Sequence, residues 1–162
     1  RKCLHFNPAV HPMRSFLGLF LGLLAGFVVV ALVEGISSLI YSRPADLDFG
    51  DREAVRVFVS TLPAGAFLIL LAAHVLGAFT AALTSVIIVG RRWIVGPLLL
   101  GFLLLIAGIV NLILIPHPAW FALGDIMVYL PSAIAGGIIG GKLVSWRRSV
   151  PDSTPSDIPT TA

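Results

Sequence analysis

The sequence predicts an all-α integral membrane protein: a bundle of four transmembrane helices with a short interfacial helix in the first outer loop. Three observations predict this fold. Of the 162 residues, 57% are hydrophobic and 12% are charged, about half the charged share of a soluble domain. Four apolar stretches exceed about 20 residues, enough to cross a hydrocarbon core of about 30 Å. The basic residues gather at the borders of these stretches.

This composition excludes a soluble enzyme, a nucleic-acid-binding protein and a disordered chain. The single cysteine, Cys3, lies outside the apolar stretches, so a disulfide scaffold is excluded as well. The net charge of +3 is explained by basic residues at the membrane borders rather than by an acidic partner. We expect no cofactor and no nucleic acid. The expected partner is the lipid bilayer, with a homodimer or a larger membrane complex left open.

The first predicted element is a membrane span over residues 16–40. Residues 1–15 form a cytoplasmic segment, in which Met13 resembles a natural start, so residues 1–12 either are not native or belong to a leader. The apolar run of about 25 residues exceeds the 7–15 residues of a secretory h-region, so it predicts a membrane helix. Pro44 follows the end of this helix.

The loop after the first span contains the predicted interfacial helix. Asp51 is a suitable N-cap, and apolar residues from Val55 to Leu62 recur at helical spacing opposite Arg52, Glu53 and Arg56. One apolar and one charged face are typical of a helix that lies on a membrane surface.

Three further spans complete a single membrane domain over residues 16–144. They are predicted at 63–89, 93–115 and 119–144, separated by Gly90-Arg91-Arg92 and by Pro116-His117-Pro118. Residues 145–162 are rich in Pro, Ser and Thr and predict a disordered cytoplasmic tail.

The distribution of basic residues predicts the orientation. Eight lie on the side of the two termini: Arg1, Lys2, Arg14, Arg91, Arg92, Lys142, Arg147 and Arg148. Only Arg43, Arg52 and Arg56 lie on the other side, mixed with acidic residues. By the positive-inside rule, both termini are cytoplasmic.

Small residues recur at a four-residue spacing inside the spans, which allows helices to approach closely in lipid. The candidate packing residues are Gly18, Gly22, Gly26, Gly77, Gly136 and Gly140. They indicate either packing within the bundle or homodimerisation through one of these faces.

Polar residues inside the spans are the candidate functional site, because an ionisable group in hydrocarbon is costly. At 1.5 Å per residue, Glu34, Asn111 and Asp125 lie about 7–10 Å below the outer ends of three helices, and His74 lies deeper. Tyr129 shares the helix face of Asp125.

Two carboxylates at one level in a low dielectric do not both carry a charge comfortably, so they share a proton, or one is protonated, or they bind a cation. This favours a proton or cation site open to the outside. The alternative is a structural cluster, in which Glu34 bonds Asn111 and Asp125 bonds the chain near His117. His74 alone is more typical of a buried histidine than of a ligand.

Several chemistries find no motif in the sequence. A membrane haem needs paired histidines on facing helices, and only His74 lies within a span. We find no H-E-x-x-H, P-loop, dinucleotide or G-x-S-x-G pattern. We therefore expect neither a metal site nor an enzyme.

Three segments resemble a group of small bacterial four-span membrane proteins. They are Glu34 late in the first span, Leu62-Pro63-Ala64-Gly65-Ala66, and the run N-L-I-L-I-P-H-P-A-W-F over residues 111–121. The similarity covers about residues 14–146. It implies a protein of the bacterial inner membrane and brings no activity, because none is established for the group.

Two functions remain open at this stage. The first is a non-enzymatic membrane protein, structural or accessory to a larger assembly, favoured by the glycine faces. The second is a small proton- or cation-coupled carrier that uses Glu34 and Asp125, favoured by the polar residues at one level on three helices.

Overall fold

A computed structural model describes residues 12–48, 50–90 and 94–149, and all its regular elements are helices. They are α1 (Pro12–Ile40), α2 (Arg52–Thr61), α3 (Ala64–Val89), α4 (Val95–Leu114) and α5 (Ala119–Ser149). All except α2 are long and apolar enough to cross a membrane. The predicted all-α membrane bundle with four spanning helices is confirmed.

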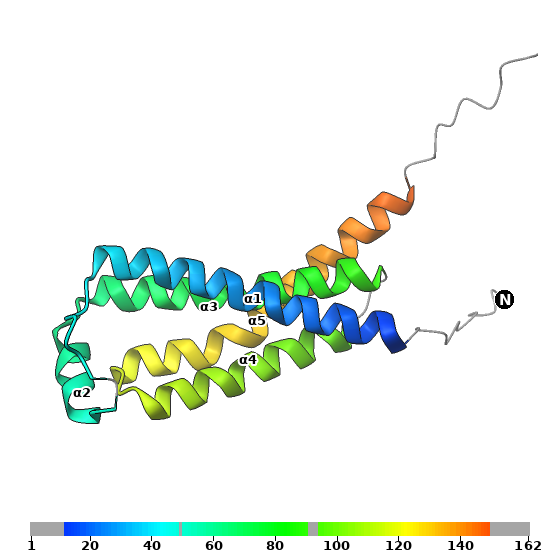
Figure 1. Cartoon of the computed structure of the whole chain (residues 1–162). Helices are drawn as coiled ribbons and strands as arrows, with labels where there is room; N and C mark the ends of the chain where they lie inside the picture. The colour runs from blue at the N-terminus through cyan, green and yellow to red at the C-terminus, as the bar shows by residue number, and fades with distance from the viewer. Residues whose placement is uncertain (1–11, 49, 91–93, 150–162) are drawn as a thin grey trace, which may run out of the picture.

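The four long helices lie side by side, with successive ones running in opposite directions, and α2 lies at one end of them (Figure 1). We call this the α2 end; it also holds the α4–α5 loop. The opposite end, which holds Arg14, Gly90 and Arg148, is the basic end. The predictions for residues 1–11, Cys3 among them, and for 91–93 and 150–162 lie outside the described residues.

Two helix boundaries differ from the predicted spans by more than two residues. Helix α1 begins at Pro12, four residues before the predicted start at 16. Helix α5 runs on to Ser149, so the prediction of a disordered tail is wrong for residues 145–149. Two interactions support the extension: Arg147 and Arg148 lie where the helix dipole favours cations, and Arg148 Nη2 donates to the Gly90 carbonyl at the end of α3.

Helix α3 is the centre of the bundle, because it packs against α1, α4 and α5. Its contact with α1 depends on the glycines of α1. A Cβ on Gly22 would lie 2.6 Å from the carbonyl oxygen of Ala81, and one on Gly26 would lie 2.8 Å from that of Gly77. Gly18 lies likewise against Val89. This glycine face therefore meets α3 of the same chain and is not free for a second copy.

Glycines make the contact between α3 and α5 equally close. A Cβ on Gly136 would overlap the carbonyl oxygen of Phe79, and one on Gly140 would lie 3.1 Å from Cβ of Val86. Backbones that meet at such distances leave no room for any side chain, so these two helices are packed through their main chains.

Helix α5 bends near its middle (Figure 1), and Pro131 lies within it. Proline has no N–H and its ring displaces the carbonyl of the preceding turn, so a bend at this position is its ordinary effect. The bend separates the half of α5 that carries Asp125 from the half that carries Gly136 and Gly140.

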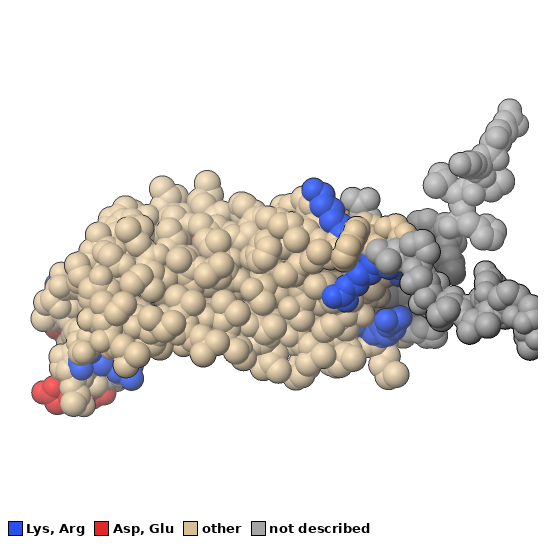
Figure 2. All heavy atoms as spheres, turned by 90° about the horizontal axis from the view of Figure 1, so that it is seen from above, with Lys and Arg blue, Asp and Glu red and all other residues tan. Residues whose placement is uncertain are grey.

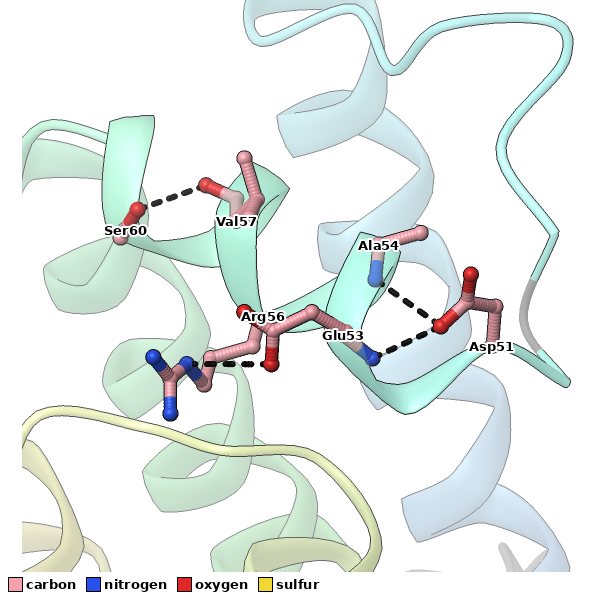
Figure 3. A network of polar contacts seen from close by, with 6 residues as sticks. All are labelled: Asp51, Glu53, Ala54, Arg56, Val57 and Ser60. Atoms are coloured by element: carbon pink, nitrogen blue, oxygen red, sulfur yellow. Dashed lines mark hydrogen bonds and ion pairs between the residues drawn. The ribbon is translucent and has the colours of Figure 1, made fainter.

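Helix α2 is stabilised by an N-cap at its first turn and by packing of its apolar face. The Asp51 carboxylate accepts bonds from the backbone N–H of Glu53 at 2.9 Å and of Ala54 at 3.2 Å, so the predicted N-cap is confirmed (Figure 3). The buried Val55 and Val59 belong to one apolar cluster with Phe67 and Phe121. The apolar face of α2 thus covers the α2 end of the bundle.

Candidate functional site

Asp125 of α5 is completely buried, and its partner is His74 of α3. The Asp125 Oδ1 and His74 Nδ1 atoms lie 2.5 Å apart. A carboxylate in hydrocarbon needs such a partner, since an unpaired buried charge is very costly. The close packing of α3 on α5 brings these two side chains, 51 residues apart in sequence, to one place.

Tyr129, one turn after Asp125, completes the cluster. Its hydroxyl donates to Asp125 Oδ2 over 3.4 Å, and its ring stacks on the His74 ring with centroids 5.4 Å apart. Gly108 of α4 makes room for it, because a Cβ there would lie 2.7 Å from atoms of the Tyr129 ring. The sequence analysis did not select Gly108, although its spacing of seven residues from the equally buried Gly101 is typical of one helix face.

A pocket of about 260 Å³, which we call the central pocket, borders this cluster. Each spanning helix contributes one polar side chain to its lining: Glu34 from α1, His74 from α3, Asn111 from α4 and Tyr129 from α5. The rest of the lining is apolar. Asp125 is not part of the lining and lies behind His74 and Tyr129.

The structure therefore groups the predicted polar residues differently from the sequence analysis. Glu34 and Asp125 were expected to interact directly or through one water, but no hydrogen bond or ion pair joins them among the described residues. Helical depth gives the height of a side chain but not its direction, and α1 packs on α3 and α4 rather than on α5. Asp125 is bonded to His74, which ranked as the weaker candidate, and not to the chain near His117.

A second pocket of about 260 Å³, the α2-end pocket, lies nearer to α2. Its polar lining includes Glu34, Tyr41, Arg43 and His117, and its apolar lining includes Phe67. Glu34 lines both pockets. The Glu34 carboxylate, on an exposed position of α1, thus lies where both pockets can be reached.

His117 lies in the α4–α5 loop beside this pocket. Its Nδ1–H donates to the Ile115 carbonyl at 2.7 Å, and its ring stacks on Phe121 with centroids 4.9 Å apart. Burial among these groups lowers the pKa of His117 below its ordinary value of 6.5, because it disfavours the charged ring.

Metal ligands do not gather in the described part of the chain: no three His, Cys, Asp or Glu side chains come close enough to hold an ion. The imidazole, carboxyl and phenol groups of His74, Asp125 and Tyr129 can donate and accept protons.

The fold and the site define a multi-pass α-helical membrane protein with a buried His–Asp pair beside a polar pocket. The chain matches no protein-family model, no curated protein and no solved structure. The resemblance to small bacterial four-span proteins, based on Glu34 and residues 62–66 and 111–121, remains a prediction.

Proposed function

We propose that this chain is a small proton-coupled membrane carrier, in which the His74–Asp125 pair takes up and releases a proton. The observation that carries the proposal is the buried pair beside a pocket to which all four spanning helices contribute a polar group. Ionisable groups inside membrane spans mark substrate and ion pathways and proton relays.

The size of the central pocket supports a proton or a very small solute as the cargo. Its volume of about 260 Å³ lies below the roughly 300–1,000 Å³ of sites that hold drug-sized ligands. A neutral His74 ring that donates from Nδ1 to an ionised Asp125 gives the pair one negative charge. One further proton makes the pair neutral, and its release restores the negative charge.

The lining of the two pockets supports a path from the α2 end. A proton that enters the α2-end pocket meets Glu34, which also lines the central pocket. From there it meets His74 and Tyr129 before Asp125, because Asp125 lies behind them. A carboxylate at this point also favours cations over anions.

The orientation of this path follows from the positive-inside rule. It puts both termini in the cytoplasm and the α2 end outside, in the inner membrane if the bacterial resemblance holds. In this orientation α2 lies at the outer interface, with the exposed Arg56 and Glu53 toward water, where their side chains pair at 3.5 Å (Figure 3).

The experiment measures protonation and flux separately. The proton on Nδ1 of His74 is followed by NMR in the wild type and in Asp125→Asn. We expect its signal to shift clearly in the variant, because the carboxylate that accepts the bond is gone. Proton flux into liposomes, read by an enclosed pH dye, should fall at least tenfold in Asp125→Asn and stay unchanged in Glu53→Gln, an exposed acid of α2. An unchanged His74 Nδ1 signal in Asp125→Asn, or equal flux in Asp125→Asn and Glu53→Gln, contradicts the proposal.

The second candidate is a structural or accessory membrane protein. It is favoured by the position of the pair, which ties α3 to α5 in a bundle already closed by glycine contacts. In this role, Asp125→Asn lowers stability while the wild type carries no proton flux. Purification from the native membrane then identifies the assembly by the proteins that accompany the chain.

A further inference from the structure

The described acidic side chains lie toward the α2 end, whereas basic side chains lie at both ends of the molecule. Arg14, Lys142, Arg147 and Arg148 lie at the basic end, whereas the exposed carboxylates of the described residues lie toward the α2 end (Figure 2). The described part of the basic end thus contains four cationic side chains and no acidic one. Cationic side chains that lie close together repel one another, so binding of an anion at this end is favourable.

Two of these cations converge on one turn. The guanidinium Nη2 atoms of Arg14 and Arg148 lie 3.6 and 4.0 Å from the point where a Cβ on Gly90 would stand. Gly90 is the left-handed cap of α3, with φ of 72°, so the chain turns sharply there and leaves this space open. Arg14 comes from α1 and Arg148 from α5, so three helices meet at this point.

Arg148 also covers the end of α3. Its Nη2 donates to the Gly90 carbonyl, which would otherwise present a negative group to an incoming anion. A guanidinium has five N–H donors in a planar fork that suits phosphate oxygens, and this bond uses one nitrogen. The remaining donors are available to a ligand, because Arg148 is exposed.

A pocket of about 210 Å³ adjoins this point, and we call it the basic-end pocket. Its lining is Ile87 and Gly90 from the α3 end, and Leu143, Val144, Arg147 and Arg148 from α5. The pocket therefore combines an apolar wall with two guanidinium groups. A ligand that satisfies both has an anionic head and an aliphatic chain.

We infer that the basic-end pocket binds the phosphodiester headgroup of an anionic phospholipid, held by Arg14, Arg147 and Arg148, with its acyl chain against Leu143 and Ile87. Basic pockets between membrane helices at the cytoplasmic face suit anionic headgroups. The site stands on different residues from the proposed proton site and does not depend on it. Free phosphate shares the headgroup chemistry but has nothing to place against the apolar wall.

The test measures retention of phosphatidylglycerol against phosphatidylcholine by the full chain, using native mass spectrometry from mixed detergent micelles. We expect the wild type to retain phosphatidylglycerol preferentially. The double variant Arg14→Gln with Arg147→Gln should lose that preference by about tenfold or more. Lys142→Gln removes a charge from the same end but outside the pocket, so it should change retention less than about twofold.

Two further arms separate this site from its alternatives. Inorganic phosphate at millimolar concentration should not displace the lipid; displacement would show a free-anion site and overturn the inference. An equal loss in Lys142→Gln would show a diffuse charge effect and overturn it as well. Arg148→Lys keeps the charge but not the planar fork, so it should weaken retention while the melting temperature shows that the chain remains folded.

Discussion

The two halves of the bundle are built on opposite principles. In the half toward the basic end, α1 and α5 meet α3 through glycines, and a Cβ on Gly22 or Gly136 would strike main-chain atoms. In the half toward the α2 end, side chains from all four long helices line the central pocket, and the Tyr129 ring lies against Gly108. His74, Asp125 and Tyr129 all lie in or beside this second half.

The difference shows where a membrane bundle of this size can place chemistry. Main-chain contact gives close packing but leaves no volume for an ionisable group. A buried carboxylate needs a partner and space for both side chains, and the half with the central pocket contains such a pair. The glycine-packed half can therefore hold the helices together while the other half contains the polar site.

The largest effect is expected for Asp125→Ala, which leaves His74 without its partner and opens a cavity at a fully buried position. Removing one partner of a buried ion pair costs about 3–5 kcal/mol of unfolding free energy. Denaturation in detergent micelles, followed by circular dichroism, measures the loss. Asp46→Ala changes an exposed aspartate and is the control. Equal stability of the two variants would show that the His74–Asp125 pair contributes nothing to the free energy of unfolding.

Gly136→Leu tests the closely packed half. The new side chain would strike the Phe79 carbonyl, so α3 and α5 must separate, at a cost of about 1–3 kcal/mol or more. The matched control is Gly35→Leu, because Gly35 is also helical but has no atom within 4 Å of an added Cβ. We expect a lower melting temperature for the first variant only. A similar melting temperature for both would contradict main-chain packing in this half.

A smaller effect is expected for Asp51→Ala, which removes the N-cap of α2. Two backbone N–H groups lose their acceptor, and such a loss costs about 1 kcal/mol. Faster hydrogen exchange at the amides of α2, with little change in α3, is the expected result. Ser60→Ala removes a hydroxyl bonded to Val57 within the same helix and is the control. Unchanged exchange in Asp51→Ala would show that the packing of Val55 and Val59 alone holds α2.

The smallest effect concerns pH and His117. Because burial lowers its pKa in the folded chain, the unfolded chain binds the proton more readily just below pH 6.5. The contribution of His117 to stability is therefore complete above about pH 6.5 and declines as the pH falls toward the folded pKa. His117→Gln should reduce the loss of melting temperature on acidification. An identical pH profile for the variant and the wild type would contradict this.

Much of the fold could be predicted from the sequence, because membrane helices are recognised by length and hydropathy alone. The four spans and the Asp51 cap are in this group. The end of α5 was misplaced, because Ser145 and its neighbours look like a polar tail. The helix continues there partly because Arg148 bonds to the carbonyl of Gly90. Gly90 lies 58 residues earlier in the chain, so this contact cannot be predicted from the local sequence.

The site was predictable in its members but not in its pairing. The members of the site can be recognised in the sequence because they are polar residues within apolar spans. They are Glu34, His74, Asn111, Asp125 and Tyr129. Their partners depend on which helices touch, and α3 lies between α1 and α5 in a way that spacing does not show. Gly108 shares a helix face with Gly101, but its contact with the Tyr129 ring depends on how α4 packs on α5.

The central place of α3 has a consequence for biosynthesis. Helix α1 has the highest mean hydropathy of the four spans and is synthesised before the other three. It lies in the bilayer without its main packing partner until α3 has been synthesised. Helix α5, the least hydropathic, carries Asp125 and is synthesised after α3. The Asp125 carboxyl group therefore enters a membrane in which its partner His74 is already present. This order of synthesis avoids an unpaired carboxyl group in the hydrocarbon, which would cost free energy.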